Sequence, residues 1–379
     1  MGCAKTGFSR RCGHSRRAMN LNRRHFLYSA AGTLPLVTAL RAEPDELKKE
    51  EGAPRNLVRA GQIGTQHGHA AGKMETMRRL TDDFEVMGIA GDDAAELSGK
   101  AFAGVPVMNR QEMLANKEVE AVVVETGFAD ACAAAHASVK AEKHVHLDKP
   151  GAVGDQHEAF ATMRKEAEAR GLVFQMGYML RYNPAFQLMA RAVQEGWLGR
   201  ITEIDAMMGK KLDDAGRREL KNAGMSGMFE LGCHLVDAVC WLMGGRPASV
   251  QSFSRPVKDD GFLDNQVAVL AYPTAVATLR CNMADPFGNP RRRFMITGTE
   301  GSMEVMPLES GKMTVRLTAA RGEYKKGEQA VTLAVGGRYD AELKAFAEAV
   351  RTKKPLPWDA AHDIAVHETA LRAAGAWRE

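Results

Sequence analysis

A lysine and an acid follow directly on a short apolar run in the middle of the chain. His144-Val145-His146-Leu147 has the pattern of a strand and continues into Asp148, Lys149 and Pro150. Charged residues at the end of a parallel strand lie at the carboxyl edge of the sheet, where open α/β sheets bind ligands. Pro150 disfavours a helical Lys149, so we expect the ammonium group to point away from the sheet end. The stretch predicts proton-transfer chemistry at Lys149; a solvated lysine in an ordinary strand-to-helix connection is the alternative.

A second polar group recurs with helical spacing. Glu230, His234 and Asp237 stand at i, i+4 and i+7 within a helix expected over 229–243, so one face presents all three. A carboxylate four residues before a histidine can hold one ring nitrogen and leave the other free for proton transfer. The apolar neighbours of these residues indicate a buried helix, in which a polar triad needs a reason. We predict that His234 is catalytic and that Glu230 orients it; a structural histidine is the alternative.

The turn after the first expected strand, 57–63, contains Gly64-Thr65-Gln66-His67-Gly68. Glycines at this turn let the backbone approach a pyrophosphate, which also gains from the N-terminus of the next helix. The match to Gly-x-Gly-x-x-Gly is imperfect, because Gln66 replaces the second glycine. We assign these five residues, together with Thr126 after the third strand, to cofactor binding. A plain tight turn is the alternative.

The end of the second strand carries the residues expected to read the adenosine ribose. Gly91 is followed by Asp92 and Asp93, and no lysine or arginine occurs before Lys100. A 2′-phosphate would therefore face two acids and no base. We predict NAD in preference to NADP, with Asp92 at the ribose.

Two His-x-His pairs, His67/His69 and His144/His146, have spacings that a metal could use on a strand. Neither has a matching cluster of acids or cysteines in the sequence, so no metal site is predicted. Outside the first 42 residues the cysteines show no CxxC spacing, and no disulfide framework is indicated: Cys132, Cys233, Cys240 and Cys281. Cys233 and Cys240 are seven residues apart on one helical face, and we expect both to be buried.

The alternation of apolar runs and helical segments sets the expected fold. Strands are predicted at 57–63, 84–90, 121–125, 144–147 and 173–176 with helices between them, which indicates a parallel sheet. After Tyr178 a polar loop is expected over 212–226, and then strands follow one another without intervening helices, which indicates an antiparallel sheet open on one face. The predicted class is α/β: an N-terminal Rossmann parallel sheet over 56–177 and an α+β domain with an open, mainly antiparallel sheet over 178–338. Closing helices, 339–379, are expected to pack back on both domains.

The first 42 residues differ in composition from the rest. They carry eight basic residues and no acid, so a formal net charge of +4 for 379 residues becomes −4 for the remainder, and no nucleic-acid partner is indicated. Asn22-Arg23-Arg24-His25-Phe26-Leu27 resembles the twin-arginine motif, and 26–40 is an apolar run too short to span a bilayer. We expect export to the periplasm by the twin-arginine machinery, with 43–55 as a linker. If the signal does not function, the protein is cytoplasmic.

These motifs together resemble the glucose–fructose oxidoreductase and inositol dehydrogenase family (Gfo/Idh/MocA). The resemblance rests on motifs that keep their order and spacing: Lys143-His144-Val145 leading into Asp148-Lys149-Pro150, Gly177-Tyr178 with Arg181-Tyr182-Asn183-Pro184, the Glu230 to Asp237 segment, and Gly298-Thr299-Glu300-Gly301. Asp148 stands where the family usually has Glu, and Glu230 where it usually has Asp.

The resemblance implies a nicotinamide ring beside Asp148, Lys149 and Pro150 and a carbohydrate or cyclitol between the domains. Lys149 and His234 would be the proton-transfer pair, and Arg181, Tyr182 and Asp237 are assigned to the substrate. It also implies a homo-oligomer through the C-terminal sheet.

We therefore expect hydride transfer between NAD(P) and a secondary alcohol or carbonyl of a sugar-like substrate. Lys149 would act as a base if a neighbouring cation and burial lower its pKa. Two alternatives stay open: cleavage of a glycoside through a transient oxidation by retained NAD, and cofactor binding without turnover.

Overall fold

The structure, a computed structural model, describes residues 56–91, 97 and 99–377. The predicted signal segment and linker lie outside these residues, and so does Asp92. No helix in the described ranges is long and apolar enough to cross a membrane.

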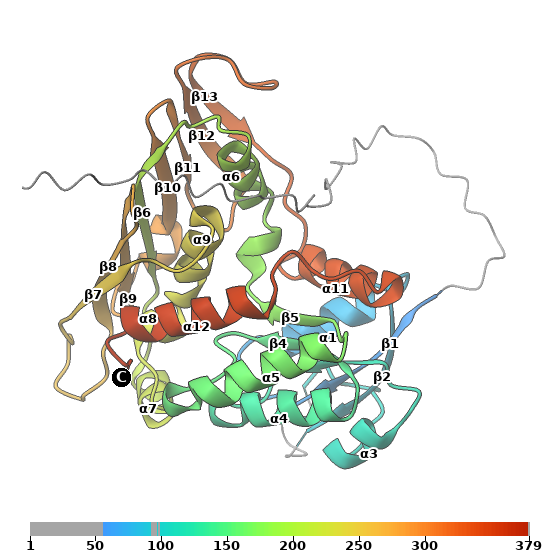
Figure 1. The fold of residues 1–379 in the computed structure, drawn as a ribbon. Helices are drawn as coiled ribbons and strands as arrows, with labels where there is room; N and C mark the ends of the chain where they lie inside the picture. Colours follow the sequence, from blue (N-terminus) through green and yellow to red (C-terminus); the bar gives the residue numbers. More distant parts are fainter. Residues whose placement is uncertain (1–55, 92–96, 98, 378–379) are drawn as a thin grey trace, which may run out of the picture. The chain divides into compact units, whose positions relative to one another are not determined.

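Five parallel strands form the first sheet, in the order β2-β1-β3-β4-β5 (Figure 1). The strands are β1 (Val58–Ile63), β2 (Phe84–Ala90), β3 (Ala121–Val124), β4 (His144–Asp148) and β5 (Phe174–Gly177). All four residues of β3 are buried, as expected for a strand covered on both faces. The prediction of a Rossmann parallel sheet is confirmed.

Helices cover both faces of this sheet, and alternate residues of β3 pack in two different cores. Val122 and Val124 pack in a core with α4 (Phe128–Lys140) and α5 (His157–Ala169). Ala121 and Val123, which point to the other face, pack in a second core with α1 (Ala70–Arg79). A short helix with a full capping box, α3 (Arg110–Ala115), precedes β3, and the 3₁₀ turn η1 (Gly154–Gln156) leads into α5.

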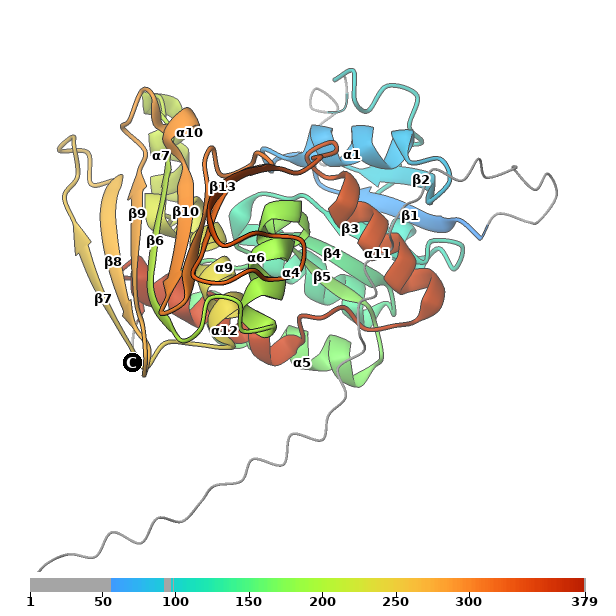
Figure 2. The ribbon, with the colours of Figure 1, turned by 90° about the horizontal axis from the view of Figure 1, so that it is seen from above.

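The last two helices return to both parts of the fold. Leu343 and Phe346 of α11 (Asp340–Thr352) are fully buried in the core that α1 shares with the first sheet. The final helix, α12 (Ala360–Ala373), packs against α5 of the first part and α9 of the second (Figure 2).

Eight strands form the second sheet, in the order β13-β12-β11-β10-β6-β9-β8-β7. Only β6 and β9 pair in parallel; the other described pairs are antiparallel. Buried and partly exposed residues alternate along β8 and β9, so one face packs on helices and the other stays open. This confirms the predicted open, mainly antiparallel sheet; the oligomer interface expected on it stays a prediction. Its strands are β6 (Ile201–Gly209), β7 (Ser249–Ser254), β8 (Asn265–Ala271), β9 (Val276–Asn282), β10 (Arg293–Gly298), β11 (Gly301–Val305), β12 (Lys312–Leu317) and β13 (Gly327–Thr332).

The predicted loop over 212–226 is wrong, because most of it is a helix, α7 (Asp214–Asn222). Asp213 caps this helix by accepting a hydrogen bond of 2.8 Å from the Gly216 N–H. The buried face of α7 consists of Arg217 and Leu220, and Arg217 pairs with Asp260 and Asp264. A helix that buries an ion-paired arginine carries little apolar periodicity, which is why the sequence pattern missed it.

The single helix predicted over 229–243 is also wrong, since α8 (Gly227–Glu230) and α9 (Cys233–Met243) are separate. At the break, a Cβ on Gly232 would lie 2.7 Å from the carbonyl oxygen of Met228, so only glycine fits this close approach. The four cysteines of the described chain are buried and free, which confirms the predicted burial of Cys233 and Cys240.

Candidate active site

Lys149 is buried and pairs with Glu230. Its Nζ donates to the Glu230 Oε1 and to the backbone oxygen of the same residue, both at 2.8 Å. Lys210 at the end of β6 approaches the other carboxylate oxygen, Oε2, at 3.2 Å. Glu230 therefore stands between two lysines and links the end of β4 to α8.

This pairing overturns the expected titration of Lys149. Burial alone would lower the Lys149 pKa, but the Glu230 carboxylate, with smaller contributions from Cys233 and Asp148, raises it above its ordinary value. Burial likewise opposes ionisation of Glu230, yet Lys149 and Lys210 hold the pKa of that carboxyl below its usual range. In this arrangement Lys149 is a cation at neutral pH and a hydrogen-bond donor, not a free base.

The structure also corrects the expected role of Glu230 toward His234. Its carboxylate is engaged by Lys149 and Lys210, and within the described chain the Nδ1 of His234 is buried with no hydrogen-bond partner. The break between α8 and α9 removes the regular i, i+4 relation on which that expectation depended. Burial first, and then the charge of Lys149, lower the His234 pKa well below its ordinary value, so this imidazole is neutral.

The turn after β1 borders a cavity of about 520 Å³ at the carboxyl edge of the sheet. Its lining includes Gln66 and His67 on one side and Gly127 to Asp130 on the other. The crevice thus lies between the loops after β1 and β3, where doubly wound sheets bind nucleotides.

The backbone around this crevice suits a dinucleotide. Gly64 has φ +88°, and a Cβ there would lie 2.6 Å from the backbone of Thr126, so the two loops approach as only glycine allows. A Cβ on Gly68 would meet nothing within 4 Å, so the side of that residue is open. No side chain caps the start of α1 or α4, and the first turn of α1 holds no acid. The uncapped N–H groups at the start of α1 suit a pyrophosphate, whereas the first turn of α4 carries the acid Asp130 and suits one less well.

Asp148 lies at the centre of a buried polar cluster. Its Oδ2 is 2.9 Å from His69 Nδ1, 3.8 Å from His67 Nδ1 and 3.7 Å from Lys73 Nζ. Lys73 in turn contacts Glu342 of α11 and the Nε2 of His146. Burial and the charge of Asp148 raise the pKa of the neighbouring Glu125 to about 7.

The residues assigned to the substrate belong to a different buried network. Arg181, in the 3₁₀ turn η2 (Met179–Tyr182), binds Asp237 at 2.6 Å and Asp363 at 2.7 Å. Tyr182 accepts a hydrogen bond of 2.7 Å from the Gln175 Nε2. These contacts account for the buried charges without a ligand, and the assignment to a substrate stays a prediction. The rest of that motif starts α6 (Pro184–Gln194), which Asn183 caps.

Sequence reasoning missed several members of the site because each comes from a distant element. Lys210, Lys73, Glu125 and Glu342 carry no motif of their own. Of these four, only Glu125 could have been found from the sequence. It directly follows β3 and precedes Thr126, so its position indicates the carboxyl edge of the sheet.

The first sheet is parallel, has a crevice at its carboxyl edge, and carries a buried lysine beside that crevice; a second sheet packs on its own helices. This combination is typical of a nucleotide-binding oxidoreductase. The chain belongs to the Gfo/Idh/MocA family. Residues 58–178 match the model described as oxidoreductase family, NAD-binding Rossmann fold, and residues 186–304 match the family's C-terminal domain. The protein is therefore an NAD(P)-dependent oxidoreductase.

Individual relatives are distant. A trans-1,2-dihydrobenzene-1,2-diol dehydrogenase of Bos taurus is 24% identical, over 61% of this chain and 69% of its own. An NADP(+)-linked scyllo-inositol 2-dehydrogenase of Bacillus subtilis is 22% identical, over 76% and 85%. The solved structure of a levoglucosan dehydrogenase with NADH and levoglucosan has a TM-score of 0.74 at 17% identity, covering 84% of this chain and 97% of that one.

Proposed function

We propose that the protein transfers hydride between NAD(P) and the secondary alcohol or carbonyl carbon of a sugar- or cyclitol-like substrate. The observation that carries the proposal is the buried Lys149–Glu230 pair close to a neutral His234 whose Nδ1 has no partner in the described chain. The names of two relatives support the substrate class, since inositol and levoglucosan are both cyclic polyols.

His234 and Lys149 have different roles in the proposed reaction. Bound NAD(P) takes up or returns the hydride. The hydroxyl proton must leave the substrate in the same reaction, and the neutral Nδ1 of His234 can accept it. Lys149, kept cationic by Glu230, donates a hydrogen bond to the oxygen that becomes negative. In the direction of reduction Lys149 polarises the carbonyl oxygen and His234 returns the proton.

Turnover of cyclic polyols, followed as NADH formation, tests this assignment. Lys149→Ala and His234→Ala should each lose roughly 10²–10⁴-fold in kcat, whereas cofactor affinity should fall far less. The double variant should lose less than the product of the two, because both residues act on one oxygen.

Lys143→Met is the matched control. Lys143 is a buried lysine of the same segment whose Nζ donates to the backbone oxygens of Asn116 and Val119 at 2.7 and 2.8 Å. It should lose stability and keep kcat. Full turnover by Lys149→Ala would refute the catalytic assignment, and a cleaved glycoside without net NADH would favour transient oxidation instead.

We propose NAD in preference to NADP, as supported by the acids Asp92 and Asp93 in the sequence after β2. Calorimetry on cofactor-free protein should show tighter binding of NAD. Tighter binding of NADP would mean that a base from another segment reaches the 2′-phosphate.

We also propose export by the twin-arginine route, on the strength of Arg23-Arg24 and the apolar run after them. Replacing both arginines with lysine should leave a folded precursor in the cytoplasm. Unchanged export by that variant would rule this route out.

A further inference from the structure

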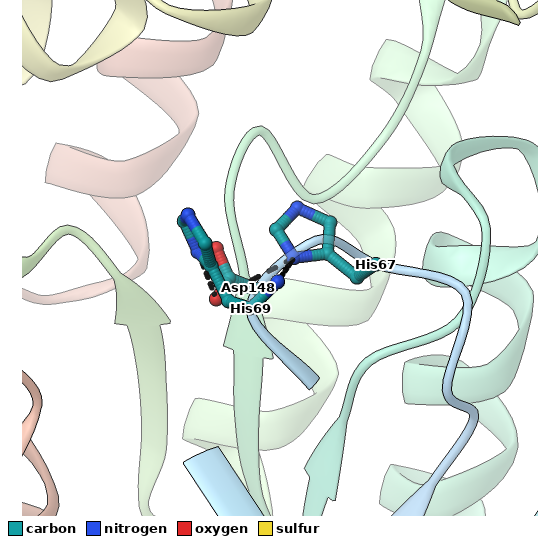
Figure 3. Close-up of side chains that lie close together, drawn as sticks. All are labelled: His67, His69 and Asp148. Carbon is teal, nitrogen blue, oxygen red and sulfur yellow. Dashed lines mark hydrogen bonds and ion pairs between the residues drawn. The ribbon is translucent and has the colours of Figure 1, made fainter. Parts of the chain in front are cut away.

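Three metal-binding side chains converge where the loop after β1 meets the end of β4. His67 and His69 come from that loop and Asp148 from the last position of β4 (Figure 3). We propose that His67, His69 and Asp148 bind one divalent transition-metal ion, and that zinc is the ion that fits them best. The site lies beside the proposed hydride-transfer residues, because Asp148 precedes Lys149 and His67 lines the crevice, but the ion takes no part in the hydride transfer.

The distances between the ligand atoms suit a small metal ion. The three ligand atoms, one from each residue, lie within 4.8 Å of one another. The Asp148 Oδ2 is 2.9 Å from His69 Nδ1 and 3.8 Å from His67 Nδ1. Zinc–nitrogen and zinc–oxygen bonds of about 2.0–2.2 Å place tetrahedral ligand atoms about 3.3–3.6 Å apart. The observed spacings bracket that range, so modest side-chain rotations bring all three onto one ion.

A buried carboxylate beside the cluster is an independent sign of a cation site. Glu125 is fully buried, and its Oε2 lies 3.2 Å from the His67 Nδ1. Within the described chain its other oxygen, Oε1, has no hydrogen-bond partner. A buried carboxylate oxygen without a partner is costly, and a cation held by His67 would relieve that cost. Glu125 is then either the fourth ligand or an outer-shell carboxylate.

The ion would fasten the cofactor loop to the catalytic strand. His67 and His69 flank Gly68 at the start of α1, and Asp148 immediately precedes Lys149. Metal binding to these residues would therefore tie the turn at the crevice to the backbone that carries Lys149, as structural zinc ties separate segments elsewhere.

Metal analysis of untagged, purified protein tests the proposal. Elemental analysis should find one zinc ion per chain, or chelator-treated protein should take up one equivalent of Zn²⁺ or Co²⁺. The Co²⁺ form should show the visible absorption bands of a four-coordinate site. His67→Ala and His69→Ala should abolish both signals, and Glu125→Gln should weaken binding by roughly 10–100-fold.

His136→Ala is the matched control, since His136 pairs with Glu166 at 2.7 Å on other helices. It should leave metal content unchanged. Melting temperature and circular dichroism of each variant show whether it is folded, and Glu125→Gln preserves shape if the alanine variants unfold. Folded apo-protein that takes up neither ion, or equal metal content in folded His69→Ala, would overturn the proposal and indicate that protons balance the cluster. Neither readout uses a substrate, so failure of the proposed function would leave this result intact.

Discussion

Arg181 and Asp148 each lie at the centre of a buried network of charges, and the two networks differ in how completely they are paired. Around Arg181, Asp237 and Asp363 accept its hydrogen bonds, and Arg164 binds the remaining Asp363 oxygen at 2.9 Å. Among the described residues, none of the charged atoms of these four side chains is buried without a partner. The Arg181 guanidinium also lies over the Trp358 ring, 4.8 Å from its centroid.

The region around Asp148 and Lys149 is paired only in part. The His234 Nδ1 and the Glu125 Oε1 are buried within the described chain without hydrogen-bond partners, and the Glu125 Oε2 and the Glu230 Oε2 make ion pairs of 3.2 Å with His67 and Lys210. A complete network holds the fold in one arrangement, whereas an incomplete one has capacity for a ligand or a proton. The charges around Arg181 are therefore paired without a ligand, whereas the polar groups at the end of β4 are not, and the substrate assignment of Arg181 and Tyr182 stays a prediction.

The largest effect on stability is expected when the complete network loses Arg181. Arg181→Met should cost about 3–5 kcal/mol in the free energy of unfolding, because Asp237 and Asp363 are left buried without their shared cation. Urea denaturation measures this cost. A normal stability with a many-fold rise in KM would reverse the comparison and make Arg181 a substrate residue.

A smaller effect is expected from removing the charge that holds Lys149. In the wild type the pKa of Lys149 is raised, so Lys149 loses its proton, and kcat falls, only at a pH above the ordinary lysine pKa. Without the Glu230 carboxylate, less negative charge offsets the effect of burial, and the Lys149 pKa falls. In Glu230→Gln the alkaline limb of the pH–kcat profile should therefore move to lower pH, because a deprotonated Lys149 has no positive charge with which to stabilise the substrate oxygen. An unmoved limb would show that Glu230 does not control Lys149.

The smallest effect is expected at the edge of the complete network. Tyr182→Phe removes one hydrogen bond, from the Gln175 Nε2, and that donor keeps the Glu342 backbone oxygen at 3.1 Å. The loss should be about 0.5–1.5 kcal/mol in thermal or urea unfolding, with KM for the polyol unchanged. A raised KM at normal stability would restore the substrate assignment of Tyr182.

Much of the fold could be predicted because the relevant residues are neighbours in the sequence. The buried run of β3 and the buried and exposed alternation of β8 and β9 are local patterns with a known meaning. The helix α7 could not be predicted in this way, because Arg217 is buried through partners more than forty residues away.

The site shows the same limit. The sequence predicts that Lys149, Glu230 and His234 matter, but their pairing depends on contacts across 81 residues of chain. Spacing alone suggested that Glu230 binds His234. The close approach at Gly232 and the competing lysines decide otherwise. The sequence shows the His67/His69 spacing but not the acids that join it, because Asp148 and Glu125 lie at the ends of other strands.

The helix α11 has a consequence for the order in which the protein can be made. Its Leu343 and Phe346 complete a core begun by Val58 and Ala60 near the other end of the described chain, and its Glu342 neutralises the buried Lys73. During synthesis the first sheet is finished long before α11 leaves the ribosome. Until then it presents an apolar face to chaperones or to aggregation, and Lys73 lacks its contact with Glu342. The core of the nucleotide-binding half is thus completed by a segment that follows both sheets in the chain, and a chain that stops before 340 should be held by chaperones or lost.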